Sequence, residues 1–164
     1  MLEKFLSKDS AGNWNTIPPV SDKQKEDINC HKFVLYAISN ITRDELVSDA
    51  TAQKKSGQDF TFGKKALAIS QKEFTLIADP KHLRDFADKN CAQGVVYVGQ
   101  ILDAETGEAA HSFLMDKMSD GTYKCADKAG FKYPFAVYSL EDLFKFENYH
   151  NQKWRFIPLD DLTV

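Results

Sequence analysis

A cysteine, a histidine and an aspartate are the residues of this chain whose types and order suit covalent chemistry. Cys30 opens an apolar segment, His111 opens an alternating segment about eighty residues later, and Asp127 ends the segment after that. A thiolate attacks a carbonyl carbon when an imidazole manages its proton, and an acid that holds the imidazole keeps the ring oriented. The order Cys, His, Asp therefore predicts a nucleophile, a base and an orienting group.

Cys30 is expected in the first turn of a helix that begins near Asn29 and ends near Ser39. The apolar residues that share one face of this helix are Cys30, Phe33, Val34, Ala37 and Ile38. Asn29 is a suitable N-cap. The positive end of the helix dipole and its free N–H groups favour a thiolate there, and the Cys30 amide can donate to a developing oxyanion. The alternative is that Cys30 is a small, inert core residue.

His111 and Asp127 can meet only if the turn between their strands has a suitable length. A two-residue turn at Asp120-Gly121 points the two side chains to opposite faces of the sheet. A three-residue loop with a left-handed Gly121 makes them diagonal neighbours on one face, and a five-residue loop or a bulge sets them opposite each other. The triad therefore requires an odd loop or a bulge. Taken singly, each residue is also explained as an ordinary strand-end residue.

The other patterns predict an α+β domain in which helices come before an antiparallel sheet. Helices are expected over 42–53, where Thr42 and Glu45 form a capping box, and over 80–90 and 139–146, with a short helical turn over 64–71. Strands are expected over 74–77, 94–102, 110–118, 122–127, 133–138 and 154–158. The Pro18-Pro19 pair makes 9–22 an irregular segment. Without repeats or a linker, the chain is expected to form a single domain over 1–164.

Composition argues against several classes of protein. The 164 residues are 43% hydrophobic and 27% charged, which is typical of globular proteins. The net charge of −3 argues against a nucleic-acid partner. No apolar run suits a membrane span or a secretory signal, so we expect a cytoplasmic protein, or one secreted without a Sec signal peptide. Three cysteines do not make a disulfide framework, so reduced thiols are expected.

A zinc site is the main alternative for the cysteines and histidines. Cys30 and His31 are adjacent, and the other possible ligands are His82, Cys91, His111 and Cys125. The chain has neither a Cys-x-x-Cys pair nor a His-Glu-x-x-His sequence, so we expect no metal and no cofactor. Cys125 alternates with Asp127 along one strand and is either near the site or, more simply, a core thiol.

Two segments resemble known enzyme families. Residues 29–36, Asn-Cys-His-Lys-Phe-Val-Leu-Tyr, are similar to the nucleophile helix of NlpC-type cell-wall hydrolases and other papain-like enzymes. Residues 111–127 resemble the His-hairpin-Asp segment of transglutaminase-like and bacteriocin-processing peptidase-like proteins, and that of bacterial effector proteases and glutamine deamidases. The resemblance implies a papain-like fold with Cys30 as nucleophile, His111 as base and Asp127 as orienting residue.

The same resemblance implies a thiol hydrolase that cleaves an amide bond of a protein or peptide substrate. It would be a peptidase, an amidase or a glutamine deamidase, and a bacterial effector or toxin is the favoured context. Gln24 and Asn29 are the candidate oxyanion donors. His31 and Lys32 stand where cell-wall hydrolases usually have small residues. Two other functions remain open, a non-catalytic interaction module on the same fold and a transglutaminase-like acyltransferase.

Overall fold

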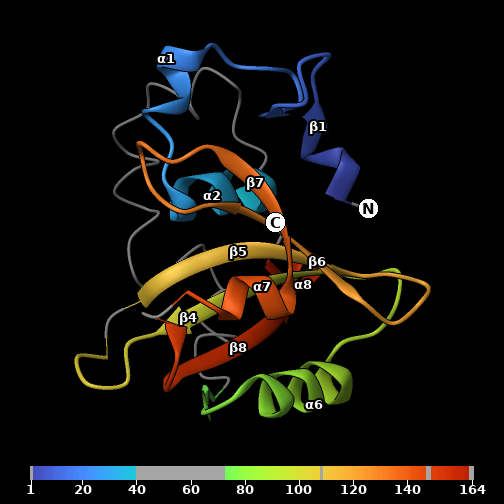
Figure 1. Cartoon of the computed structure of the whole chain (residues 1–164), viewed down its shortest axis with the longest axis vertical. Helices are drawn as coiled ribbons and strands as arrows, with labels where there is room; N and C mark the ends of the chain where they lie inside the picture. Colours follow the sequence, from blue (N-terminus) through green and yellow to red (C-terminus); the bar gives the residue numbers. More distant parts are fainter. Residues whose placement is uncertain (1, 40–72, 108, 147–148, 163–164) are drawn as a thin grey trace.

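The computed structural model describes residues 2–39, 73–107, 109–146 and 149–162. Its centre is a six-stranded sheet with the strand order β3-β8-β4-β5-β6-β7 (Figure 1). The strands are β3 (Thr75–Ile77), β4 (Val96–Leu102), β5 (Ala109–Lys117), β6 (Tyr123–Lys128), β7 (Phe135–Ser139) and β8 (Gln152–Pro158). All described neighbours pair antiparallel. The chain is therefore α+β with an antiparallel sheet, as predicted.

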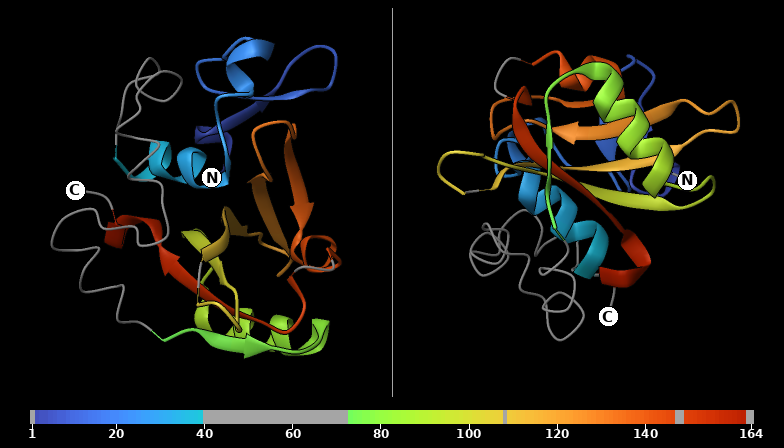
Figure 2. Two further views of the ribbon diagram at one scale, coloured as in Figure 1. Left: turned by 90° about the vertical axis from the view of Figure 1, so that its left-hand side faces the viewer. Right: turned by 90° about the horizontal axis from the view of Figure 1, so that it is seen from below.

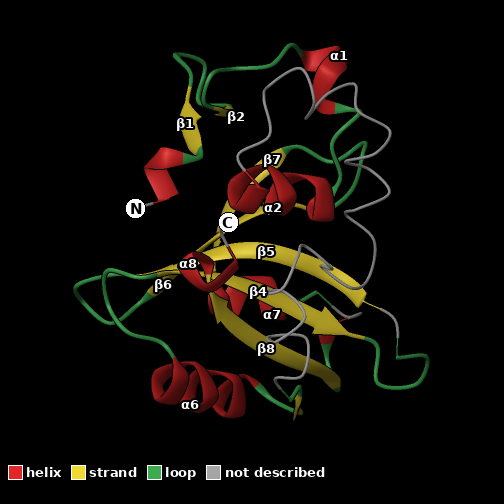
Figure 3. Ribbon diagram, turned by 180° about the vertical axis from the view of Figure 1, so that it is seen from behind, coloured by secondary structure: helices red, strands yellow, loops and turns green. Residues whose placement is uncertain are grey.

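Helices cover both faces of this sheet. On one face α2 (Cys30–Ser39) packs across β5, next to α8 (Leu159–Leu162) (Figure 3). On the other face lie α6 (Pro80–Asn90) and α7 (Leu140–Phe144), and Figure 2 shows α6 on the side of the sheet away from α2. Successive strand residues divide between two cores, because side chains along a strand alternate in direction.

The N-terminal segment differs from the prediction of irregular structure over 9–22. Here β1 (Leu6–Lys8) pairs with β2 (Trp14–Thr16), η1 (Leu2–Lys4) precedes them and α1 (Asp22–Lys25) follows. The prediction was wrong for 14–16 because Asp9 closes a hairpin: its side chain accepts from the N–H groups of the loop, and the loop contains a left-handed glycine. The Pro18-Pro19 pair affects only the chain that follows the hairpin.

The other described elements lie close to their predicted ranges. The helix predicted over 80–90 has those bounds, and the predicted strands differ from β3 to β8 by at most two residues at either end. The helix predicted over 139–146 is shorter, since α7 begins after its Ser139 cap. The helix predicted over 42–53 and the helical turn predicted over 64–71 lie outside the described residues. No helix in the described ranges is both long enough and apolar enough to cross a membrane.

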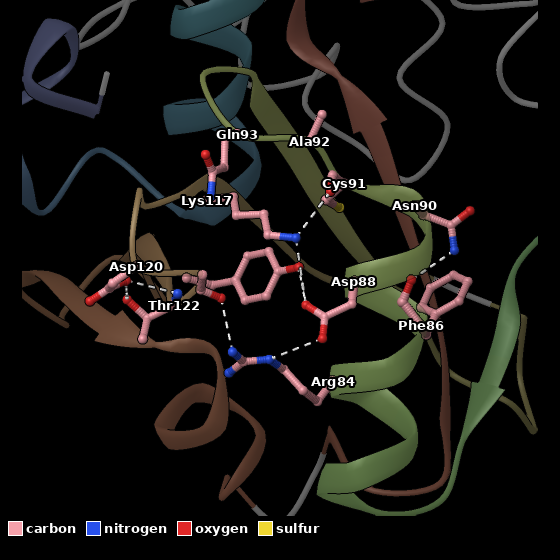
Figure 4. Close-up of polar contacts among 12 residues, drawn as sticks. Arg84, Phe86, Asp88, Asn90, Cys91, Ala92, Gln93, Lys117, Asp120 and Thr122 are labelled. Carbon is pink, nitrogen blue, oxygen red and sulfur yellow. Dashed lines mark hydrogen bonds and ion pairs between the residues drawn. The ribbon is translucent and has the colours of Figure 1, made fainter.

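The β5–β6 hairpin is fastened to α6 by charged and aromatic side chains (Figure 4). The Tyr123 hydroxyl donates to Asp88 at 2.7 Å, and Lys117 Nζ lies 3.7 Å from the same carboxylate. Arg84 donates to the carbonyl oxygen of Gly121 at 2.8 Å. Burial and then the hydrogen bond to Asp88 raise the pKa of Tyr123, so its hydroxyl remains a donor. These contacts hold the turn on which the register of the hairpin depends.

Gly99 makes room for an aromatic side chain in the middle of the sheet. It is the cross-strand partner of Phe113, and a Cβ atom at position 99 would lie 2.1 Å from the Phe113 ring. That ring stacks against His111 with the centroids 6.0 Å apart, and it meets Trp154 edge-on at 5.9 Å. The absence of a side chain at position 99 therefore sets where Phe113, and with it His111, can lie.

Candidate active site

The β5–β6 hairpin brings His111 and Asp127 to one face of the sheet. The loop 119–121 has three residues, closed by a 2.7 Å backbone hydrogen bond between the residues on either side, and Gly121 is left-handed with φ of +86°. The strand pairing that follows makes His111 and Asp127 diagonal neighbours on one face. This is one of the odd loops that the triad requires.

His111 is held from three directions. Its Nε2 atom forms an ion pair with Asp127 Oδ1, and the two side chains are only 1% and 2% exposed. The rings of Tyr149 and Phe113 stack on the imidazole, with centroids 5.0 and 6.0 Å away. Burial lowers the pKa of His111, but its hydrogen bonds to Asp127 and to Cys30 outweigh burial and raise the pKa to about 9. Since Nε2 faces Asp127, Nδ1 is the nitrogen that remains for the Cys30 sulfur.

Cys30 is the first residue of α2, at the expected position in the helix. The Asn29 side-chain oxygen accepts the backbone N–H of Lys32 at 2.8 Å, which is the capping bond that the sequence predicts. The members of the predicted apolar face whose side chains are described are buried, namely Cys30, Phe33, Val34 and Ala37. The packing of this face on β5 fixes where the first turn, and therefore the sulfur, lies.

The surroundings of the Cys30 thiol favour its ionised form. Burial raises the pKa of the thiol, but hydrogen bonds from His111 and His31, together with the charge of both rings, lower it to about 6. The N-terminus of α2 acts in the same direction. With the pKa of His111 raised to about 9, a thiolate and an imidazolium coexist around neutral pH. Such a pair is the reactive form of a thiol nucleophile.

His31 is a member of the site that the sequence indicated only as a possible zinc ligand. Its Nδ1 atom lies 2.8 Å from Ser112 Oγ, and its ring hydrogen-bonds to Cys30. His31 is half-buried, whereas Cys30 and His111 are buried. The His31 ring is therefore a second imidazole at the sulfur. It is held by Ser112, whose side chain lies on the α2-facing side of β5. Its supporting residue is 81 positions away in the chain, so no local pattern reveals the contact.

Lys128 is a second residue that the sequence did not assign to the site. It is fully buried, and its Nζ donates to the carbonyl oxygens of Gly130 at 2.6 Å and Phe131 at 3.0 Å. Burial lowers its pKa to about 8, although the negative charges of Asp127 and Cys30 oppose that effect. When charged, Lys128 adds to the positive potential that stabilises a thiolate at Cys30.

Both predicted oxyanion donors have capping roles. Gln24 forms a capping box with Ser21: the Ser21 N–H donates to Gln24 Oε1 at 2.9 Å, and the Gln24 N–H donates to Ser21 Oγ at 3.1 Å. Asn29 caps α2. Their assignment to the oxyanion stays a prediction. At Cys30 itself the helix geometry supplies a backbone N–H that has no acceptor within the helix.

The structure also bears on the role of Cys125 and on the predicted alternative of a zinc site. Cys125 is buried in the core beside α7, where burial and then the charge of Asp127 raise its pKa, so it is a poor nucleophile. Within the described residues, no three His, Cys, Asp or Glu side chains are grouped as ligands of a metal ion. The three cysteines are free thiols.

A surface cavity of about 490 Å³ adjoins the chain segments that lead into and out of the site. Its lining includes Trp14, Glu26, Phe131, Tyr133 and Phe135. Glu26 lies just before α2, and the aromatic residues of the β6–β7 loop lie just after Asp127. Another cavity of about 550 Å³, between α6 and β8, is lined by His82 but not by Cys30, His111 or Asp127. A scan against protein-family models and searches of curated proteins and of solved structures find no match for the chain.

Proposed function

We propose that this protein is a papain-like thiol hydrolase that cleaves an amide bond of a protein or peptide substrate. Cys30 would be the nucleophile, His111 the base and Asp127 the residue that orients His111. The observation that carries this proposal is the continuous chain of contacts from the Cys30 sulfur through the His111 ring to the Asp127 carboxylate. The position of the sulfur at the start of α2 supports it, because helix N-termini stabilise thiolates.

Acylation begins from the thiolate–imidazolium pair. The Cys30 sulfur attacks the carbonyl carbon, a C–S bond forms, and the π electron pair moves to the carbonyl oxygen. When this pair returns, the C–N bond breaks and the leaving nitrogen takes the proton from His111. The products are a thioacyl enzyme, a neutral His111 and a free amine. Asp127 keeps the imidazole facing the sulfur and stabilises its protonated form.

Deacylation restores the starting state. Water attacks the thioester carbon while His111 accepts its proton, the C–S bond then breaks, and a carboxylic acid leaves. Peptide bonds, cell-wall amides and glutamine side-chain amides all suit this scheme, because they differ only in the leaving nitrogen. If an amine replaces water, the same thioacyl enzyme gives acyl transfer.

The aromatic cavity between the segment that precedes α2 and the β6–β7 loop supports a protein or peptide as substrate. Phe131 and Tyr133 are 38% and 63% exposed, so both present aromatic surface to a bound partner. They line the cavity together with the charged residues Lys25 and Glu26. A mixed aromatic and charged lining suits an extended polypeptide, which offers both apolar side chains and polar backbone groups.

A non-catalytic interaction module is the second candidate, and burial favours it. Cys30 is 6% exposed and His111 is 1% exposed, so a reagent has little direct access to either. A binding domain with an inert cysteine would have the same burial. Reactivity separates the two functions, because a core thiol is alkylated slowly near neutral pH and an activated thiolate is alkylated fast.

The test is iodoacetamide labelling of the folded protein near neutral pH, with the modified cysteine identified by mass spectrometry. We expect selective labelling of Cys30, slowed by His111→Ala and unchanged by His82→Ala, since His82 is an exposed histidine of α6. Labelling of Cys30 only on unfolding would contradict the proposal and favour the interaction module. For a reactive protein, peptide mixtures compared between wild type and Cys30→Ser then identify the bond that is cleaved.

A further inference from the structure

We infer that Lys128 is a positioning residue for substrate recognition, because its buried ammonium group holds the turn between β6 and β7 that carries Phe131 and Tyr133. These two aromatic side chains line the cavity of about 490 Å³. The inference rests on the proposed function and deepens it by naming the residue that shapes the surface for a polypeptide substrate. Lys128 takes no part in the bond-breaking steps, so its effect should appear chiefly in peptide recognition.

The ammonium group of Lys128 contacts the turn from the protein interior. Lys128 is fully buried, and its Nζ donates to the carbonyl oxygens of Gly130 at 2.6 Å and Phe131 at 3.0 Å. The Gly130 oxygen also accepts the backbone N–H of Tyr133 at 3.2 Å. Two successive peptide groups of the turn therefore direct their oxygens toward one charge. Hydrogen bonds from a charged donor are stronger than neutral ones, so the ammonium group fixes the conformation of the turn.

The conformation of this turn decides where the aromatic wall of the cavity lies. The side chains of Phe131 and Tyr133 are exposed, whereas the ammonium group that holds their backbone is closed to solvent. A Cβ atom at position 130 would lie 3.3 Å from Tyr133 Cδ2, so the Tyr133 ring packs directly on the backbone of Gly130. A displaced turn would carry this ring with it. Trp14 of β2 lines the same cavity, so the turn and β2 together bound the aromatic surface.

A buried charge is costly at this position, because an apolar residue of similar length would fill the space without the desolvation of an ammonium group. Lys128 keeps its charge near neutral pH, since burial lowers its pKa only to about 8. The ring of Phe135, its cross-strand partner, lies 5.7 Å from Nζ and favours the charged form. Among the described residues, the hydrogen-bond acceptors of this charge are the two carbonyl oxygens of the turn. The charge therefore serves the turn.

Lys128 is close enough to the proposed catalytic residues and to the cavity to interact electrostatically with both. Burial lowers its pKa, and the negative charges of Asp127, Cys30 and Glu26 oppose that effect. Glu26 lines the cavity. Lys128 directly follows Asp127 in β6, and the side chains of successive strand residues leave the strand on opposite faces. The end of β6 therefore serves His111 through one residue and the cavity wall through the next.

The experiment compares reagents that alkylate the Cys30 sulfur by the same displacement of iodide and differ only in the attached peptide. They are iodoacetamide, iodoacetyl-pentaglycine and an iodoacetyl peptide with the sequence Ala-Phe-Ala-Phe-Ala. Each peptide is made with the iodoacetyl group at its N-terminus or on an added C-terminal lysine, which covers both directions of binding. Rates near neutral pH are measured for wild type, Lys128→Met, Tyr133→Ala and Lys124→Met, with Cys30→Ser as the blank. Lys124→Met is the matched control, because Lys124 is an exposed lysine of the same strand.

Each peptide rate is divided by the iodoacetamide rate of the same protein, which removes any change in the thiolate itself. We expect wild type to favour the phenylalanine peptide over pentaglycine by on the order of 10-fold, the discrimination typical of an apolar pocket. Lys128→Met and Tyr133→Ala should both lose this preference, and Lys124→Met should keep it. Circular dichroism checks that each variant is folded. If Lys128→Met does not fold, ¹⁵N NMR of wild type tests the same contact, because the buried Lys128 ammonium protons should exchange with water far more slowly than those of Lys124.

Three results would overturn the inference and leave the proposed function intact. In the first, Lys128→Met is folded and keeps the wild-type preference. In the second, the Lys128 ammonium protons exchange as fast as those of Lys124. In the third, a reactive wild type shows no preference for the phenylalanine peptide, so the aromatic wall does not bind the substrate. A wild-type Cys30 that is inert to iodoacetamide and to all the peptides would overturn the proposed function, and with it this inference.

Discussion

His111 contacts Asp127 although the two residues are not cross-strand partners. His111 is paired with Ile101 on β4, and Asp127 is paired with Ala136 on β7. They meet diagonally across β5 and β6 through the ion pair between Nε2 and Oδ1. A shift of the hairpin by one residue would turn Asp127 to the other face. The proposed site therefore depends on the register of one hairpin.

The rate of Cys30 labelling should depend on pH with a midpoint of about 6. The thiol pKa is lowered because His111 and His31 hydrogen-bond to the sulfur, so the thiolate is lost only as the pH falls through about 6. In His111→Ala the midpoint should move up toward the value of about 8.5 for a free thiol. The denatured protein serves as the control. A midpoint near 8.5 in the folded wild type would contradict this assignment.

Asp127→Asn should lower the pKa of His111. The hydrogen bond and charge of Asp127 are the main factors that raise this pKa to about 9, so the proton of the imidazolium should be lost at a lower pH in the variant. A fall of about 1 to 3 units is typical for the loss of a close carboxylate. An NMR titration of the His111 ring measures it without a substrate. Asp116→Asn, at a buried aspartate on the opposite face of β5, should leave the titration unchanged.

Asn29→Ala should destabilise the protein by about 1 kcal/mol, because it removes the N-cap of α2. Asn29→Asp keeps a capping oxygen and should be close to wild type. Urea unfolding gives the free energies of unfolding. The alanine variant should also label more slowly at Cys30, since the first turn holds the sulfur in place. Equal stability of all three proteins would show that this cap has no energetic role.

Gly121→Ala should destabilise the protein by about 1 to 2 kcal/mol, since φ at this position is +86°. Gly107→Ala is the matched control, because Gly107 has φ of +73° and an added Cβ has open space at both positions. The two variants should lose similar stability by urea unfolding. Only the change at Gly121 should lower the rate of Cys30 labelling, because only that turn sets the register of His111 and Asp127. Equal effects on labelling would contradict this role of the turn.

Local patterns in the sequence were sufficient for the elements that carry the proposed triad. The stripe from Cys30 to Ala37 and the Asn29 cap indicate α2, since both signals lie within a few residues. The hairpin pattern indicates β5 and β6 and limits the loop to a few forms. Which loop forms is decided by tertiary contacts, because Arg84 of α6 binds the Gly121 carbonyl from outside the hairpin.

Side-chain contacts that no local sequence pattern indicates account for what the sequence did not predict. His31 contacts Ser112 of β5, which is far from it in the chain. Lys128 can be buried because the carbonyl oxygens of Gly130 and Phe131 accept hydrogen bonds from its ammonium group. Lysine is a poor candidate for a core position until those acceptors are known. The strand at 14–16 depends on the Asp9 side chain, which closes a hairpin without a standard two-residue signal. The papain-like assignment and the single domain over 1–164 stay predictions.

The contact between Gly99 and Phe113 has a consequence for the evolution of this chain. Because a Cβ at position 99 would overlap the ring of Phe113, the two positions cannot vary independently. A homologue with a larger residue at position 99 should carry a smaller one at position 113, and its imidazole at position 111 would lose one of its two stacking rings. Covariation between positions 99 and 113 would therefore show that Gly99, which has no side chain, helps to hold His111 by leaving space for Phe113.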